Sequence, residues 1–273
     1  MHLPANTFSA RHETLGADTS ASRGTPITGS ATVNVKGAWA NIGGATSFAY
    51  EAISIFLERN SPAADYVIDI GISDGTNVFV VVPDLRVPAL ITGAVFAATL
   101  PIHIPSGAQI SARSAGSVGS AVMDVVVAGH SVGIGGASGF SRAIALYTPA
   151  SSRGVAIDAG ATANTKGAYA ELTASSGADI AALFGCVGNN TDIARGALTF
   201  LLDIAIGGSG AEQLVLSNLF LASNTAFDAV LPPFIGPYPC GIPASTRFSA
   251  RLQCSGTTAG DRTIDLALYG LVP

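Results

Sequence analysis

The sequence predicts an all-β protein built as two tandem jelly-roll-like β-sandwich domains related by internal duplication. Three observations lead to this fold class: segments of the first half return in the second, apolar residues alternate with a period of two, and no convincing amphipathic helix is present. Short strands bounded by turn residues are typical of a sandwich. An immunoglobulin fold would favour a cysteine pair around a tryptophan, so a jelly roll fits better.

The repeated segments indicate the duplication directly. Ile104–Arg113 returns as Ile242–Arg251 at an offset of 138 residues, and Ser-Ala-Arg closes both segments. The offset between matching residues grows from 130 to 141 along the chain, as small loop insertions in one copy of a repeated unit would produce. The other matches are Ser22-Arg23-Gly24 with Ser152-Arg153-Gly154, Lys36-Gly37-Ala38-Trp39 with Lys166-Gly167-Ala168-Tyr169, Ile68-Asp69-Ile70 with Leu202-Asp203-Ile204, and Asp124 and Gly129 with Asp265 and Gly270.

The matches divide the chain of 273 residues into two copies with flanking segments. Copy one is expected at 29–130 and copy two at 151–273. Residues 1–28 are rich in Ser, Thr and Ala without apolar periodicity, so we expect an N-terminal arm outside the core. This arm is either a frayed tail or an anchor that orders on a partner subunit. Residues 131–150 hold four glycines and one proline, which is typical of a flexible linker.

The strands of copy one follow in order from the alternation of apolar residues. The segment 52–57 has the period of a strand, and 66–72 follows with three isoleucines on one face. Ser73–Asn77 carries the Asp-Gly signal of a hairpin, so 78–82 is the expected return strand. Copy two repeats the plan. Later strands are expected within 89–104, 109–113 and 123–127, and the matching inward residues of copy two are Leu202, Ile204, Ile206, Phe248, Ala250, Ile264, Leu266 and Leu268.

The composition favours a part of a larger assembly. Charged residues are only 11% of the chain, against about 25% in an average globular protein. A weakly charged surface suits a protein that other subunits cover. The net charge of −5 and the pI near 5.2, without any basic run, argue against a nucleic-acid partner.

The sequence also predicts no membrane helix and no metal site. The longest uncharged apolar stretch, Val87–Ile104, is interrupted by Pro88 and Pro101. The N-terminus shows no secretory signal, so we expect a chain made in the cytosol and either kept there or released by lysis. No C-x-x-C spacing indicates zinc, and a framework disulfide would appear in both copies. We therefore expect free thiols at the three cysteines, all in copy two: Cys186, Cys240 and Cys254.

One motif resembles a catalytic one. Gly129–Gly133 matches the G-x-S-x-G nucleophile elbow of hydrolases. Its context does not fit, because a glycine-rich stretch follows in place of a helix and all four histidines precede Ser131. The glycines within 133–139 also lack the Lys-Ser/Thr of a phosphate-binding loop. We therefore assign no catalytic, cofactor-binding or metal-binding residue.

Four carboxylates at matching positions are candidates for the acid and base of glycoside hydrolysis. Their repetition in both copies favours a structural role instead. Arg113 and Asp124 are expected on facing strands of a hairpin, both outward, and Arg251 and Asp265 likewise. Cross-strand ion pairs, each contributing about a few tenths of a kcal/mol when exposed, are the expected explanation. The four carboxylates are those of Asp69, Asp203, Asp124 and Asp265.

Trp39 and Tyr169 hold the same position in the two copies. An aromatic ring exposed at a repeated position can stack on a sugar ring, which makes both residues candidate glycan contacts. The alternative is a ring that closes the edge of the sandwich beside Lys36 or Lys166. His103, without an acid or cysteine near it in the sequence, is expected to be a solvated side chain.

Three motifs carry a resemblance to a known group of proteins. They are Lys-Gly-Ala-Trp/Tyr, the Leu-Leu-Asp-Ile-x-Ile-Gly of Leu201–Gly207, and Ile104–Arg113. They resemble β-sandwich modules in virion structural proteins of tailed bacteriophages, such as head decoration, head spike or fibre-base proteins and tail or baseplate appendages. The resemblance covers both copies. Copy two departs from it with Ala244-Ser245 in place of Ser106-Gly107, which suggests a different turn.

The resemblance implies a non-enzymatic virion protein that is assembled in the host cytoplasm. It implies a homo-oligomer, with a trimer favoured, that binds other virion proteins through its N-terminal arm. From the residues themselves we also expect no cofactor, no nucleic-acid partner and no membrane association. Two alternatives remain: an adhesin of the virion that binds a host receptor or surface glycan, and, less favoured by its residues, a hydrolase.

Overall fold

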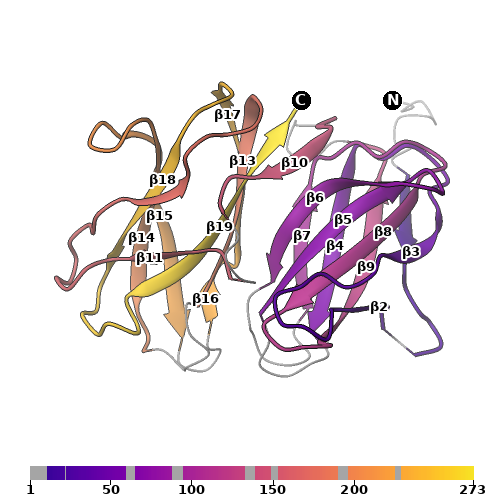
Figure 1. Cartoon of the computed structure of the whole chain (residues 1–273), viewed down its shortest axis with the longest axis horizontal. Helices are drawn as coiled ribbons and strands as arrows, with labels where there is room; N and C mark the ends of the chain where they lie inside the picture. Colours follow the sequence, from indigo (N-terminus) through magenta and orange to yellow (C-terminus); the bar gives the residue numbers. More distant parts are fainter. Residues whose placement is uncertain are drawn as a thin grey trace, which may run out of the picture.

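The computed structural model describes residues 11–21, 23–59, 65–87, 95–132, 139–148, 153–189, 196–224 and 229–273. All regular elements in these ranges are β-strands, arranged as two β-sandwiches side by side (Figure 1), which confirms the predicted all-β fold class. The strands of the first half are β1 (His12–Leu15), β2 (Thr25–Thr28), β3 (Ala40–Ala45), β4 (Ala52–Arg59), β5 (Tyr66–Ser73), β6 (Val78–Val87), β7 (Val95–Leu100), β8 (Gln109–Gly116) and β9 (Val122–His130). Those of the second half are β10 (Arg142–Ala145), β11 (Val155–Asp158), β12 (Ala170–Thr173), β13 (Ile180–Asn189), β14 (Thr199–Ile206), β15 (Gln213–Asn224), β16 (Ala229–Leu231), β17 (Phe234–Ile242), β18 (Phe248–Cys254) and β19 (Thr263–Val272).

The two halves share one strand order. In the first half the β9 sheet runs β1-β9-β4-β7, with β2 also paired to β9, and the β8 sheet runs β3-β8-β5-β6. In the second half the β19 sheet runs β10-β19-β13-β17, with β11 also on β19, and the β18 sheet runs β12-β18-β14-β15-β16. Every strand of the first half therefore has a counterpart in the second, where β16 is extra. This order is what a duplicated unit predicts, and the duplication itself stays a prediction.

The core lies between the two sheets of each sandwich. Ile53, Ile55 and Leu57 of β4 are completely buried, whereas Phe56 between them is 37% exposed. This is the period-two pattern of a strand with one face on the core. Burying branched aliphatic side chains on the facing strands in this way supplies most of the stabilisation of such a fold.

The predicted boundaries of the arm and the linker need correction. β1 and β2 lie inside the predicted arm 1–28, yet both pair with β9 and bury Leu15 and Ile27 in the core. β10 lies inside the predicted linker 131–150 and pairs with β19. These strands are four residues long and bury one side chain each, which leaves too little alternation to recognise. Residues 1–10 of the arm and 133–138 and 149–150 of the linker lie outside the described residues.

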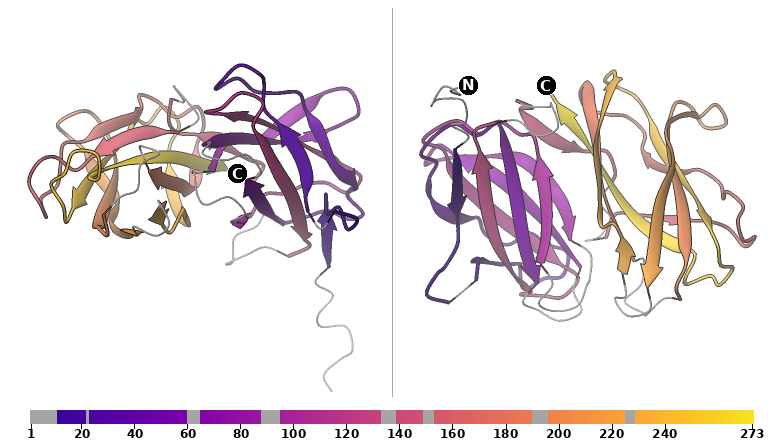
Figure 2. Two further views of the ribbon diagram at one scale, coloured as in Figure 1. Left: turned by 90° about the horizontal axis from the view of Figure 1, so that it is seen from below. Right: turned by 180° about the vertical axis from the view of Figure 1, so that it is seen from behind.

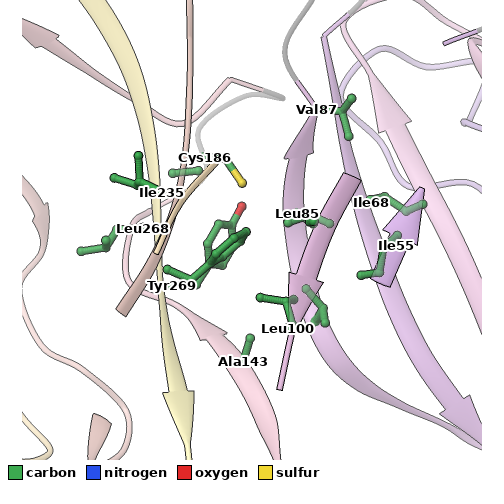
Figure 3. Close-up of a cluster of buried hydrophobic side chains, with 14 of the residues drawn as sticks. Ile55, Ile68, Leu85, Val87, Leu100, Ala143, Cys186, Ile235, Leu268 and Tyr269 are labelled. Carbon is green, nitrogen blue, oxygen red and sulfur yellow. The ribbon is translucent and has the colours of Figure 1, made fainter. Parts of the chain in front are cut away.

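The two halves meet along β6 of the first half and the β19 sheet of the second (Figures 1 and 2). Figure 3 shows Leu85 of β6 on one side of this junction and Cys186 and Tyr269 on the other, and all three side chains are completely buried. The hydroxyl of Tyr269 donates a hydrogen bond to the backbone carbonyl of Asp84 in β6. The halves are thus joined by a continuous apolar core and by hydrogen bonds across it.

Candidate functional site

In the first half, the buried carboxylate of Asp69 gathers several side chains on the outer face of the β8 sheet. It accepts hydrogen bonds from Lys36 Nζ at 2.6 Å, Arg113 Nε at 2.8 Å and the backbone N–H of Asp84 at 2.8 Å. The Arg113 guanidinium lies 4.7 Å from the centre of the Trp39 ring. Burial of the carboxyl raises the pKa of Asp69, but the charge of Lys36 and these hydrogen bonds outweigh burial and leave the pKa below its ordinary value.

The second half repeats this arrangement. Asp203 accepts hydrogen bonds from Lys166 Nζ at 2.7 Å, Arg251 Nε at 2.9 Å and the backbone N–H of Asn218 at 2.9 Å. The Arg251 guanidinium lies 4.6 Å from the centre of the Tyr169 ring. Burial again raises the pKa of Asp203, and the hydrogen bonds and the positive charges again leave it below its ordinary value. The repeated carboxylates therefore hold charged side chains in place, and the same chemistry occurs at the same position twice.

The predicted ion pair of Arg113 with Asp124 is wrong, and so is that of Arg251 with Asp265. Each arginine pairs instead with the aspartate of its own sheet, directly across the β5–β8 or the β14–β18 pairing. The strands β9 and β19, which carry Asp124 and Asp265, belong to the other sheet of each sandwich. Adjacent strands along the chain were expected to form one hairpin, but here the chain crosses between sheets after β8 and after β18.

The two candidate glycan contacts, Trp39 and Tyr169, are both partly buried. One face of each ring is covered by an arginine, Arg113 or Arg251. A Cβ at Gly71 would lie 3.2 Å from the Trp39 ring, so this ring also packs closely against β5. Such a cation–π pair is worth about 0.5–1 kcal/mol at an exposed site. The rings thus have a structural role, and their contact with a glycan stays a prediction.

Ser131 of the G-x-S-x-G motif follows β9 directly and is tied to the N-terminal strand. Its Oγ accepts a hydrogen bond from the backbone N–H of Arg11 at 2.8 Å. The neighbouring His130 contacts Ser54 instead, with 2.9 Å between Nε2 and Oγ. Gly133 lies outside the described residues. In the part of the motif that the structure describes, no histidine is hydrogen-bonded to the hydroxyl of Ser131.

Several smaller predictions can be compared with the structure. The three cysteines are free, as predicted: Cys186 and Cys254 are buried, and Cys240 is partly exposed. The side chain of His103 is 43% exposed, as predicted, but its Nδ1 lies 3.3 Å from Oε1 of Glu51, a partner far away in the sequence. Within the described ranges, no group of three or more His, Cys, Asp or Glu residues could hold a metal ion. No helix in them is long and apolar enough to cross a membrane.

Sequence reasoning missed Arg86, which is completely buried where the two halves meet. Its Nη2 lies 3.4 Å from a carboxylate oxygen of Asp65 and 3.4 Å from one of Asp265, and it donates a hydrogen bond to the backbone carbonyl of Asn189 at 3.1 Å. Arg153 Nε lies 2.9 Å from the other carboxylate oxygen of Asp65. Arg86 and Asp65 belong to the first half and the other three residues to the second, so this charge cluster ties the halves together. The available signal was an arginine in a strand that is otherwise apolar except for Asp84.

A pocket of about 450 Å³ opens on the outer face of the β9 sheet. Asp124 lines it and is only 2% exposed. Neither carboxylate oxygen of Asp124 has a hydrogen-bond partner among the residues that the structure describes. A buried carboxylate without partners is costly in a folded protein and points to a ligand or partner. The pocket is lined by Ala17, Asp18, Thr19, Arg23, Gly24, Phe56, Glu58, Val95, Asp124 and Val126.

Comparisons with known proteins found no matching family model and no matching curated protein. Among solved structures, an f-lectin (fucolectin) from striped bass (Morone saxatilis) serum is 12% identical, with 94% of this chain and 88% of that chain covered and a TM-score of 0.24. The CBM22-1–CBM22-2 tandem domain of Paenibacillus barcinonensis Xyn10C is 10% identical, with 96% and 91% covered and a TM-score of 0.25. A structure of infectious bursal disease virus, Gx strain, is 12% identical, with 99% and 74% covered and a TM-score of 0.24. Likenesses this low carry no argument about function.

Proposed function

We propose that the chain is a non-enzymatic structural component of a phage virion that binds other virion subunits, as a capsid decoration, head spike or tail-associated protein. The repeated motifs that resemble phage virion modules support this proposal. The junction supports it too, because the buried Arg86 cluster joins the two sandwiches, so that a subunit bound to one half also positions the other. Since β1 and β2 belong to the first sandwich, the proposed anchoring arm is reduced to residues 1–10.

One observation carries the proposal, namely two exposed apolar side chains on the outer face of β15. Phe220 is 65% exposed and Leu214 is 50% exposed. They lie opposite Leu201 and Ala205 of the neighbouring strand β14. Both side chains are therefore on the face of the β18 sheet that points away from the core. Large apolar side chains exposed near a sheet edge favour coverage by another protein. We propose this face as a contact between copies of the chain in a homo-oligomer, with a trimer favoured.

Mass photometry of the purified chain tests the proposal. The wild type should form trimers or larger rings. Phe220→Asp should shift the mass distribution to monomers, because the dissociation constant of the oligomer should rise about tenfold or more. The matched control is Val33→Asp, which also places a carboxylate on an exposed apolar residue, 51% exposed in a loop of the first half. It should oligomerise like the wild type. A wild-type chain that stays monomeric, or that mass spectrometry does not find in purified particles, contradicts the proposal.

The alternative function is a receptor- or glycan-binding adhesin of the virion. It is favoured by one observation: Trp39 and Tyr169 are partly exposed rings at matching positions, each beside a partly exposed arginine that can hydrogen-bond sugar hydroxyls. On a glycan array, binding that disappears in the Trp39→Ala, Tyr169→Ala double variant, while the variant stays soluble, supports the adhesin. Absence of binding by the wild type, or loss of soluble protein in the variant, argues against it.

A further inference from the structure

The junction between the halves shows which side chains the outer face of the β19 sheet binds. Asp265 of β19 contacts the guanidinium of Arg86, and Arg153, just before β11, contacts the carboxylate of Asp65. The second half thus offers an aspartate and an arginine, and the first half inserts an arginine and an aspartate. Charge-assisted contacts of this kind are strong and directional where water is excluded.

We call Asp265 and Arg153 the receiving pair, and Arg86 and Asp65 the inserting pair. A second receiving pair, Asp124 and Arg23, lies on the open face of the first half. Asp124 lies opposite Pro26 of β2, as Asp265 lies opposite Ala156 of β11. Arg23 precedes β2 by the same spacing that separates Arg153 from β11. The glycine after each arginine is also matched, since a Cβ there would lie 2.8 or 2.7 Å from the backbone of β9 or β19. The receiving site is therefore present twice in the chain.

The inserting pair is present only once. Arg86 lies opposite Val67, and the matching pair in the second half is Phe220 opposite Leu201. The position that matches Asp65 is Thr199, directly before the strand pair Phe200 and Cys254 that matches Tyr66 and Gly116. A second copy of the chain that docked in the same way would present a phenylalanine and a threonine. Docking of this kind would leave the carboxylate of Asp124 without a cation, which favours a different protein as the source of the complement.

From this equivalence we propose that the pocket at Asp124 receives an arginine side chain of another protein, with a neighbouring carboxylate on that protein contacting Arg23. Asp124 is buried and has no hydrogen-bond partner among the described residues, while its counterpart Asp265 contacts a guanidinium. The pocket is also more acidic than its counterpart, because Glu58 lies opposite Asp124 where Gly188 lies opposite Asp265. The inference goes beyond the proposed function, since it depends on the pocket and not on a virion.

Amide NMR spectra of the full chain, titrated with N-acetyl-arginine-N-methylamide, test the proposal. The citrulline counterpart has nearly the same shape and no charge, and serves as the paired probe. The arginine compound should shift the amides of β2 and β9 around Asp124 and bind about tenfold or more tightly than the citrulline compound. Asp124→Asn should reduce arginine binding to the citrulline level. The matched control is Asp74→Asn in an exposed hairpin, where Asn can still accept the turn hydrogen bonds.

Two further variants keep the test decisive if Asp124→Asn does not fold. Glu58→Gln should weaken arginine binding about threefold, and Arg23→Gln should strengthen it about threefold because it removes a like charge beside the probe. Equal shifts from the arginine and citrulline compounds, or wild-type affinity in Asp124→Asn with an otherwise unchanged spectrum, overturn the proposal. A monomeric chain absent from particles would end the proposed function and leave these titrations unaffected.

Discussion

The first and second halves have the same strand order and the same Lys–Asp–Arg cluster, but the outer faces of their β9 and β19 sheets have different surroundings. The β19 face packs against β6, and the β9 face is open and carries the pocket. Counted from the matching aspartates, Phe56 of the open face corresponds to buried Cys186, and Ala128 corresponds to buried Tyr269. The comparison shows that the inward residues specify the sandwich, whereas the outward residues reflect what covers each face.

The largest expected effect on stability comes from a variant that disrupts the junction between the two halves. Arg86→Met keeps most of the apolar stem but removes the guanidinium that contacts Asp265 and Asp65, while Arg153 still contacts Asp65. Removing one partner of a buried ion cluster costs about 3–5 kcal/mol. We expect a loss of this size in the free energy of unfolding, measured by urea denaturation.

Two controls accompany this variant. Arg142→Met removes an exposed arginine of β10 and should change the free energy of unfolding by less than about 0.5 kcal/mol. The double variant Arg86→Met, Asp265→Asn removes both charges of one contact and should recover a substantial part of the loss. If Arg86→Met were as stable as Arg142→Met, the buried cluster would not be what holds the halves together.

Much of the fold could be predicted because it depends on local patterns. The alternation around Ile53 and Ile55 and the Asp-Gly turn between β5 and β6 each report on neighbouring residues alone. The matches between the halves then predicted that Asp69 and Asp203 hold the same position in the two sandwiches. What could not be predicted depends on which sheet a strand joins.

The candidate site shows that limit most clearly. Arg113 and Asp124 lie on consecutive strands, and nothing local indicates that the chain passes to the other sheet between them. Arg86 has no charged counterpart in the second half, where Phe220 holds the matching position, so the repeated segments could not draw attention to it. The pocket at Asp124 is recognisable only by comparison with Asp265, whose partner lies 179 residues away in the sequence.

The next prediction sharpens the comparison of the Lys–Asp–Arg clusters. Lys36 has a second carboxylate, since its Nζ lies 2.9 Å from Asp84, whereas Asn218 stands at that place in the second half. Asp69→Asn therefore leaves its lysine an anionic partner, and Asp203→Asn does not. We expect losses of about 1–2 kcal/mol and about 2–3 kcal/mol respectively in the free energy of unfolding. Equal losses in urea denaturation would mean that Asp84 contributes nothing to the first cluster.

The same two carboxyls predict how stability depends on pH. The pKa values of Asp69 and Asp203 are both below the ordinary value of 3.8 in the folded chain. Their contribution is therefore complete above pH 3.8 and is lost as the pH falls through the lower folded values. The double variant Asp69→Asn, Asp203→Asn should lose less stability than the wild type between pH 5 and pH 2, measured by urea denaturation at each pH. A parallel loss in both proteins would place the acid sensitivity elsewhere.

The smallest effect compares the two aspartates of the receiving sites, and we expect opposite signs. Asp265→Asn weakens the contact with Arg86 and should destabilise the chain. Asp124→Asn removes a charge that is buried without a partner among the described residues, so it should raise the free energy of unfolding by about 1 kcal/mol. A carboxylate retained at that position against stability is expected where a partner uses it. If urea denaturation at pH 7 showed both variants destabilised alike, Asp124 would be a structural residue like Asp265, and the open face would lose its strongest indication of a partner.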